Sequence, residues 1–226
     1  MEAALTAGPA GATRLALIFD FDGLLMDTES TQLLSWQYEW RQHGLELDVT
    51  KFFADHGGDV SDLRYAALAA AVGPAYDRMS SHARRVAYRD SLNAVLEFRP
   101  GIREWLDSAD GFRLAVASSS PAAWVLPFLE QSGYRSRFDV VACGDEVPAH
   151  KPDPAVYQLA LRRLGAVPAQ AIAFEDTPHG VAAAKAAGLR CVAIPNPHAD
   201  PARFAAADTV LVSAKDMTLA EVVSLW

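Results

Sequence analysis

The strongest constraint on the fold is the alternation of short apolar runs with helix-length segments after residue 98. Each run is about five residues long, the length of a strand rather than a helix. The runs are residues 112–117, 138–142, 170–174 and 190–194, and an earlier one is 15–19. Strand–helix–strand alternation predicts a parallel sheet covered by helices on both faces. We therefore expect an α/β core with a Rossmann-like, doubly wound parallel sheet.

Two helices between these runs have clear start and stop signals. Segment 153–165 begins with Asp-Pro and ends with glycine, and segment 177–188 begins with Thr-Pro and ends with glycine. Asp or Thr can cap a helix, proline suits its first turn, and glycine suits the position just past its end. Pro127 lies inside segment 120–132, so that helix should be kinked or short.

Residues 29–97 have a different pattern, with amphipathic helix-length segments and no run typical of a strand. The segments are 31–43, 61–72 and 76–96. We predict that they form an α-helical cap inserted into the core, with hinges near 27–29 and 97–100. The predicted division is a flexible tail at 1–13, a core at 14–28 and 98–226, and a cap at 29–97.

Composition and charge exclude several classes of function. The chain has 226 residues, of which 51% are hydrophobic, and a formal net charge of −8. This charge argues against nucleic acid or an anionic membrane as a partner, because both favour a basic surface. The two cysteines, Cys143 and Cys191, are too few for a disulfide framework or a cysteine zinc site. Without a secretory signal or a membrane-length apolar run, we expect a cytoplasmic monomer.

Two carboxylates follow the first strand directly, in the run Asp20-Phe21-Asp22-Gly23. Ligands of parallel sheets bind outside the carboxyl ends of the strands, where these acids should lie. One carboxylate can act as a covalent nucleophile, a second as a general acid and base, and Mg²⁺ binds such oxygens. An ordinary turn with two solvated Asp side chains is the alternative for these residues alone.

Polar residues also follow other predicted strands. Ser118 follows one run, Glu175 and Asp176 follow another, and Lys151 precedes a helix. Taken singly, they could be a turn hydroxyl, helix-capping groups and a solvated cation. Together they would bring acids, a hydroxyl and an ammonium to one sheet edge. That combination favours metal-assisted phosphoryl transfer.

The order of these motifs resembles the haloacid-dehalogenase-like superfamily, in its branch of small phosphatases and sugar phosphomutases with a helical cap. The matching pieces are Asp20-Phe21-Asp22-Gly23-Leu24-Leu25-Met26-Asp27-Thr28-Glu29, Ser118, Lys151-Pro152-Asp153-Pro154 and Glu175-Asp176-Thr177. The resemblance covers essentially the whole chain after residue 13.

The resemblance implies a role for each matching residue. Asp20 is expected to be the nucleophile that becomes an aspartyl-phosphate, and Asp22 the acid for the leaving oxygen and the base for water. Ser118 and the backbone amide of Ser119 would hold the phosphate. Lys151 would offset the charge of the nucleophile and of the transferring oxygens.

The resemblance also implies Mg²⁺ as the cofactor. Asp20, the backbone carbonyl of Asp22, and Asp176 would be its ligands, with Glu175 bound to the metal directly or supporting it from outside. Dehalogenases of this superfamily lack the acid at Asp22 and need no metal. Its presence here favours phosphate chemistry over carbon–halogen cleavage.

The expected activity is hydrolysis of a small phosphorylated metabolite, such as a sugar phosphate or a phosphoglycolate-like compound. A β-phosphoglucomutase-like activity is the alternative, and a non-catalytic binding module is a third. Mutases of this branch carry a basic residue where this chain has Asp59 and Val60, and a His where it has Gln32. Both differences weaken the mutase interpretation.

The cap should close over the site, exclude water and select the leaving group. We expect residues 56–59 to form the loop that faces the nucleophile. The remaining basic and aromatic residues are expected to have structural roles. Arg64, Arg84, Arg85 and Arg89 should lie on solvated helix faces, and Trp36, Tyr38, Trp40 and Trp124 should pack in the core or at the hinge.

Overall fold

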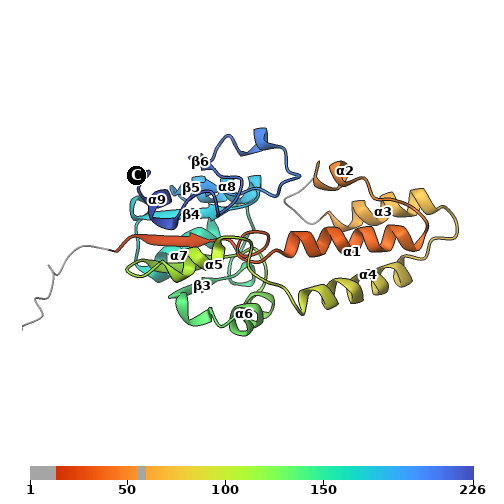
Figure 1. The fold of residues 1–226 in the computed structure, drawn as a ribbon, viewed down its shortest axis with the longest axis horizontal. Helices are drawn as coiled ribbons and strands as arrows, with labels where there is room; N and C mark the ends of the chain where they lie inside the picture. The colour runs from red at the N-terminus through yellow and green to blue at the C-terminus, as the bar shows by residue number, and fades with distance from the viewer. Residues whose placement is uncertain (1–13, 55–59) are drawn as a thin grey trace, which may run out of the picture.

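A computed structural model describes residues 14–54 and 60–226. In these ranges the chain forms a parallel sheet flanked by helices, with a further group of helices at one end of the molecule (Figure 1). No helix within them combines the length and the apolar character that a membrane crossing requires. The predicted tail at 1–13 and the predicted loop at 56–59 lie outside the described residues.

The sheet has six strands in the order β3-β2-β1-β4-β5-β6, all parallel. The strands are β1 (Ala16–Phe19), β2 (Arg113–Ala117), β3 (Val140–Ala142), β4 (Ala171–Glu175), β5 (Arg190–Ala193) and β6 (Thr209–Val210). The five predicted strands are therefore confirmed to within two residues at each end. Strand β6 was not predicted, because two residues are too few to form a pattern.

Helices cover both faces of the sheet, as expected of a doubly wound fold. Helices α5 (Ile102–Asp107), α6 (Ala122–Gln131) and α9 (Leu219–Val223) pack on one face. Helices α7 (Ala155–Leu164) and α8 (Pro178–Ala186) pack on the other. Successive side chains of a strand point to opposite faces. Leu and Phe of β1 therefore face α5 and α6, whereas the alanines of β2 and β4 face α7 and α8.

The predicted start and stop residues lie at the helix ends, as expected. Gly165 ends α7 in the left-handed conformation, with φ 62°. The Thr177 hydroxyl caps α8 by accepting a hydrogen bond of 3.1 Å from the Gly180 amide, and Pro178 is the first residue of that helix. Helix α6 is ten residues long, as is α7, and continues to Gln131 beyond Pro127, so the predicted kink or shortening stays a prediction.

The cap helices lie beyond the carboxyl end of β1 (Figure 1). They are α1 (Thr28–Gln42), α2 (Val49–Ala54), α3 (Ser61–Val72) and α4 (Arg78–Asn93). Three were predicted, and the six-residue α2 was not. They have a separate apolar core that includes Trp36, Tyr65 and Leu68. The chain returns to the sheet where Phe98 pairs with Met26. The exact boundaries of cap and core stay a prediction.

One predicted surface residue of the cap is buried, so that prediction was wrong. Only 4% of Arg85 is exposed. Its guanidinium donates hydrogen bonds to the Tyr65 hydroxyl at 2.8 Å and to Gln32 Oε1 at 3.2 Å, and it lies 4.7 Å from the Trp36 ring centroid. Sequence pattern assigns Arg to solvent, whereas here polar side chains and an aromatic face replace the water.

Gly101 lies where the chain returns from the cap to the core, and its close packing against Ala214 can be tested by substitution. It has φ 90°, and a Cβ there would lie 2.6 Å from the backbone carbon of Ala214. Gly111 has φ 92° but would meet nothing within 4 Å. Gly111→Ala should lose about 1–2 kcal/mol from the conformation alone. Gly101→Ala should lose at least about 2 kcal/mol more, because the backbone segments must separate.

Urea unfolding of the two variants measures this difference. Equal losses would contradict the close packing of Gly101 against the segment that contains Ala214.

Candidate active site

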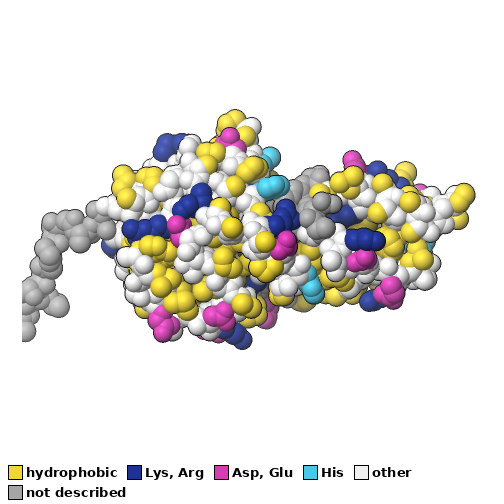
Figure 2. Space-filling view, turned by 90° about the horizontal axis from the view of Figure 1, so that it is seen from above, with side chains coloured by type: hydrophobic (Ala, Val, Ile, Leu, Met, Phe, Trp, Pro, Cys, Tyr) yellow, Lys and Arg dark blue, Asp and Glu magenta, His cyan; other side chains and the backbone are white. Residues whose placement is uncertain are grey.

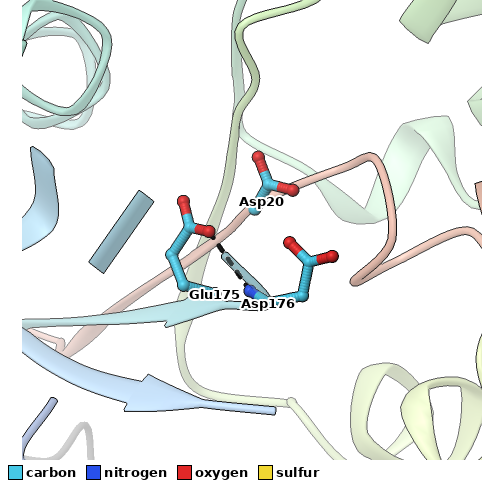
Figure 3. A group of neighbouring side chains, drawn as sticks. All are labelled: Asp20, Glu175 and Asp176. Carbon is cyan, nitrogen blue, oxygen red and sulfur yellow. Dashed lines mark hydrogen bonds between the residues drawn. The ribbon is translucent and has the colours of Figure 1, made fainter. Parts of the chain in front are cut away.

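The predicted acids meet at one edge of the sheet. Phe19 of β1 pairs with Val116 of β2 and with Phe174 of β4, so the residues after these strands lie side by side. Asp20, Glu175 and Asp176 form an acidic cluster in which one carboxylate oxygen from each residue lies within 4.8 Å of the other two (Figure 3). All three are buried, and Asp20 is the most exposed at 6%.

Lys151 binds two members of this cluster. Its Nζ donates hydrogen bonds to Asp20 Oδ1 and, at 2.6 Å, to Glu175 Oε1. Burial alone would lower the pKa of Lys151, but the adjacent carboxylates of Asp20 and Glu175 outweigh burial and raise it. Lys151 is therefore a fixed ammonium rather than the solvated cation that its position alone would allow.

Glu175 has both oxygens engaged within the protein. Oε1 accepts from Lys151 and, at 2.6 Å, from the Tyr157 hydroxyl, and Oε2 accepts from the Asp176 amide at 3.2 Å. Gly180 of α8 makes room for this carboxylate, because a Cβ there would lie 1.9 Å from Glu175 Cδ. Because both of its oxygens are already hydrogen-bonded, Glu175 is better suited to orient Lys151 than to bind an added ligand.

Asp176 has the opposite surroundings. It is fully buried, yet neither carboxylate oxygen has a hydrogen-bond partner. Burial raises its pKa far above the usual range, and the negative charges of Asp20 and Glu175 add to that shift. A buried carboxylate without partners is costly unless a cation or a proton neutralises it. The oxygen-rich cluster around Asp176 therefore fits a hard divalent cation such as Mg²⁺.

Burial and nearby charges also shift the pKa of Asp20. Burial raises its pKa, Lys151 opposes that shift, and the pKa comes to about 8 because Glu175 and Asp22 add negative charge nearby. The same cation that satisfies Asp176 would lower the pKa of Asp20 and keep its carboxylate charged.

Asp22 lies outside the three-membered cluster and has its own set of donors. The Ser120 hydroxyl donates to Oδ2 at 2.6 Å, and the Trp124 indole N–H donates to Oδ1 at 2.9 Å. The Ser118 hydroxyl lies 3.5 Å from Oδ2, and the Ser119 hydroxyl accepts a 3.4 Å hydrogen bond from the backbone amide of Lys151. The predicted residue Ser118 thus lies beside Asp22, and Ser119 lies beside Lys151.

A cavity of about 740 Å³ lies between this sheet edge and the cap. The core contributes Asp20, Asp22 and Asp176, together with three serines, Lys151 and two histidines, to its walls. The cap contributes Thr28, Glu29, Thr31, Gln32, Val60, Ser61, Arg64, Arg89 and Asn93. Arg64 and Arg89 therefore face a cavity rather than open solvent, and Trp124, which packs against the core as predicted, also lines this cavity.

Sequence reasoning missed Arg99, which ties three segments together. Its guanidinium donates to the carbonyl oxygens of Gly23 at 2.6 Å, Ile194 at 2.8 Å and Pro195 at 3.1 Å. It thereby fixes the turn after Asp22 to the end of β5. The partners are separated from Arg99 by more than 70 residues, so no local pattern could have indicated them.

Glu29 is a second residue to which the sequence assigned no role. It lines the cavity at the start of α1, close to Gly23. Burial raises the pKa of Glu29 to about 7, and the adjacent charge of Asp22 adds to the shift. The negative charge around the cavity therefore extends from the sheet edge to the hinge of the cap.

The fold and this sheet edge define a Rossmann-like enzyme with an inserted helical cap. A family comparison gives the same class: the model for haloacid dehalogenase-like hydrolases matches residues 17–194. The chain therefore belongs to the haloacid dehalogenase-like hydrolase family, as the motifs indicated.

Relatives with named activities support this assignment. Validoxylamine A 7'-phosphate phosphatase of Streptomyces hygroscopicus subsp. limoneus is 31% identical over 89% of this chain and 93% of its own length. Fructose-1-phosphate phosphatase YqaB of Escherichia coli (strain K12) is 33% identical over 78% of this chain and 94% of its own. Among solved structures, CbbY of Rhodobacter sphaeroides in complex with phosphate has a TM-score of 0.66 and 32% identity, covering 89% of this chain and 95% of its own.

Gly180→Ala tests the packing beneath Glu175. In an ordinary helix this change would stabilise the protein by about 1 kcal/mol. Here the new methyl group would overlap the Glu175 carboxylate, so we expect a net loss of about 2 kcal/mol and a lower kcat as Lys151 loses its orientation. Unfolding by urea gives the stability.

Ala182→Gly is the matched control on the exposed side of α8. It should lose about 1 kcal/mol from helix propensity alone. A stabilised Gly180→Ala variant with unchanged activity would show that Glu175 is not confined as described.

Proposed function

We propose that this protein is a Mg²⁺-dependent phosphatase that hydrolyses small phosphorylated metabolites through a phosphorylated Asp20. One observation carries the proposal. Asp20 is hydrogen-bonded to a buried ammonium, Lys151, beside Asp176, whose two oxygens lack any partner. A nucleophile, a fixed cation and an unsatisfied metal ligand at one site suit phosphoryl transfer, which depends on positioning and charge neutralisation.

Asp20 is the nucleophile. Lys151 binds its Oδ1, so Oδ2 is the oxygen available to attack phosphorus. In the first step the Asp20–phosphorus bond forms and the bond to the leaving oxygen breaks, while Asp22 gives that oxygen a proton. In the second step Asp22 accepts a proton from water, whose oxygen displaces Asp20 and releases inorganic phosphate.

Ser118 and Ser119 hold the phosphate in this mechanism. The buried Ser118 hydroxyl accepts a 3.0 Å hydrogen bond from the Ser120 amide, and its own proton, which is directed at Asp22 Oδ2 over a long 3.5 Å contact, can turn to a phosphate oxygen. The charge of Lys151, whose Nζ is hydrogen-bonded to Asp20 Oδ1, offsets the transferring oxygens. These donors act where charge develops, which is the most effective way to stabilise a transition state.

Mg²⁺ would be held by Asp20, Asp176 and the backbone carbonyl of Asp22, with Glu175 supporting it through Lys151. When bound, the ion supplies positive charge that neutralises the phosphoryl oxygens. The hydrogen bonds of Glu175 to Lys151 and Tyr157 support an indirect role for this residue rather than direct coordination.

Phosphate esters of sugars or related polyols are the proposed substrates. The cap side of the cavity offers hydroxyl and amide groups from Thr31, Gln32 and Asn93. Such groups pair with the hydroxyls of a polyol better than with an apolar leaving group. The named substrates of the two phosphatase relatives are of this class.

A phosphomutase is the second candidate, because Arg64 and Arg89 bring positive charge to the cap side of the same cavity. A mutase needs such a contact for a second phosphate. We expect hydrolysis instead. With β-glucose 1-phosphate and a glucose bisphosphate activator, the protein should release phosphate and form negligible glucose 6-phosphate. Isomerisation faster than phosphate release would assign the protein to the mutases.

Asp20→Asn should abolish phosphate release, because an amide cannot form the phosphoenzyme. We expect a fall in kcat of at least about 10³-fold, measured as phosphate release from a panel of sugar phosphates with Mg²⁺. Asp110→Asn, at an exposed position, is the control and should keep full activity. An active Asp20→Asn variant would refute the nucleophile assignment, and a wild type inactive on the whole panel would refute the function.

Metal binding has a test that does not depend on activity. Saturating Mg²⁺ should raise the melting temperature, because at 100 times its Kd a ligand stabilises the folded state by about 2.7 kcal/mol. Asp176→Asn should abolish this shift. The variant without metal should be at least as stable as the wild type, since the change removes a buried charge that has no partner.

Differential scanning calorimetry with Mg²⁺ or with a chelator measures both effects. A full Mg²⁺ shift in Asp176→Asn would show that the ion binds elsewhere.

A further inference from the structure

We propose that Trp124 is a positioning residue for Asp22: its indole N–H binds one carboxylate oxygen and thereby orients the other toward the proposed phosphate holder. The inference rests on the proposed phosphatase function. It concerns a residue that no motif assigns to the site, in the first turn of α6.

The geometry gives the two oxygens of Asp22 different partners. Oδ1 accepts from Trp124 Nε1 at 2.9 Å, whereas Oδ2 accepts from the Ser120 hydroxyl at 2.6 Å and lies 3.5 Å from the Ser118 hydroxyl. Ser118 is the proposed phosphate holder. Oδ2 is therefore the oxygen on the phosphate side, and Oδ1 is the oxygen on the α6 side.

The indole and hydroxyl partners differ in whether they can accept a hydrogen bond, and this difference distinguishes the two oxygens of Asp22. An indole N–H can only donate, so the oxygen that it binds must remain an acceptor in both protonation states of Asp22. A hydroxyl can donate to a carboxylate and can also accept from a carboxylic acid. Trp124 therefore holds Oδ1 as an acceptor, and Oδ2, whose hydroxyl partners can either donate or accept, is the oxygen suited to exchange a proton.

The assignment matters for both proposed steps. While Asp20 forms its bond to phosphorus, the proton on Oδ2 moves to the leaving oxygen, which departs as an alcohol, and Asp22 becomes a carboxylate. The water that then attacks phosphorus returns one proton to Oδ2, and the bond from Asp20 to phosphorus breaks. Without the indole N–H, the proton could reside on Oδ1, on the side away from the phosphate holder.

The surroundings of Trp124 support a role beyond packing. Its ring is half-buried and lines the cavity, and it meets Phe128 edge to face at a centroid distance of 4.8 Å. Phe128 in turn lies beside Phe21, which is adjacent to both Asp20 and Asp22. The aromatic contacts hold the ring in place, and its one polar atom is directed at the catalytic candidate.

The test is the dependence of kcat/KM on the leaving group, because only a defect in proton delivery discriminates among leaving groups. Wild type and Trp124→Phe are assayed with substituted phenyl phosphates of graded leaving ability, which share one shape. We expect 4-nitrophenyl phosphate to change less than about twofold and the poorest leaving group to fall about tenfold or more. The slope of log kcat/KM against leaving-group basicity thus becomes steeper.

Trp105→Phe is the matched control. Its indole also donates one hydrogen bond, at 2.9 Å to the carbonyl of Met217, but it belongs to α5 and does not line the cavity. It should leave the slope at the wild-type value. Benzothienylalanine at position 124 replaces only the N–H by sulfur and should reproduce the steeper slope even if Trp124→Phe folds poorly.

An unchanged slope in both position-124 variants, or an equal loss on every substrate, would reduce Trp124 to a packing residue and overturn the inference. In that case the phosphatase activity of the wild type would still stand. A wild type that cleaves none of these esters with Mg²⁺ would instead remove the proposed function itself.

Discussion

The ion pairs of Lys151 are the interaction on which the rest of the site depends. A buried ammonium would be unfavourable on its own, but Lys151 lies between Asp20, after β1, and Glu175, at the end of β4. Since β1 and β4 are neighbouring parallel strands, the ammonium joins two strand ends that are more than 150 residues apart in the chain. Removing Lys151 would leave two buried carboxylates without their shared cation, whereas removing either carboxylate would leave the ammonium with one.

The packing of the core explains how so many polar groups are held at this edge. Small side chains on one face of the sheet bring α7 and α8 close, so that Tyr157 and Gly180 reach Glu175 from beneath. On the other face, Phe21 and Phe128 support the turn that carries Asp22. The site is therefore built on rigid elements of the core, and we expect the cap side to select the leaving group.

Much of this arrangement could be predicted from the sequence, because strand length, helix caps and motif order are local signals. The parallel sheet, the inserted helices and the meeting of Asp20, Glu175 and Asp176 all followed from them. Arg99 could not be found, since its three carbonyl partners are brought to it only by folding. Arg85 was misassigned, and the hydrogen bond of Trp124 to Asp22 was missed, because residue type alone reveals neither a buried polar network nor a polar contact at a cavity wall.

The balance of charge supports the proposal that this site binds a cation before it accepts a phosphate ester. Asp20, Asp22, Glu175 and Asp176 place four carboxylates around one ammonium. A phosphate dianion entering this site would face a net negative charge in a region with little water to screen it. Without a cation, the raised pKa values of Asp20 and Asp176 favour the protonated form of these carboxyl groups. In the proposed mechanism a protonated Asp20 would be a poor nucleophile, and a divalent cation would neutralise the site while keeping Asp20 charged.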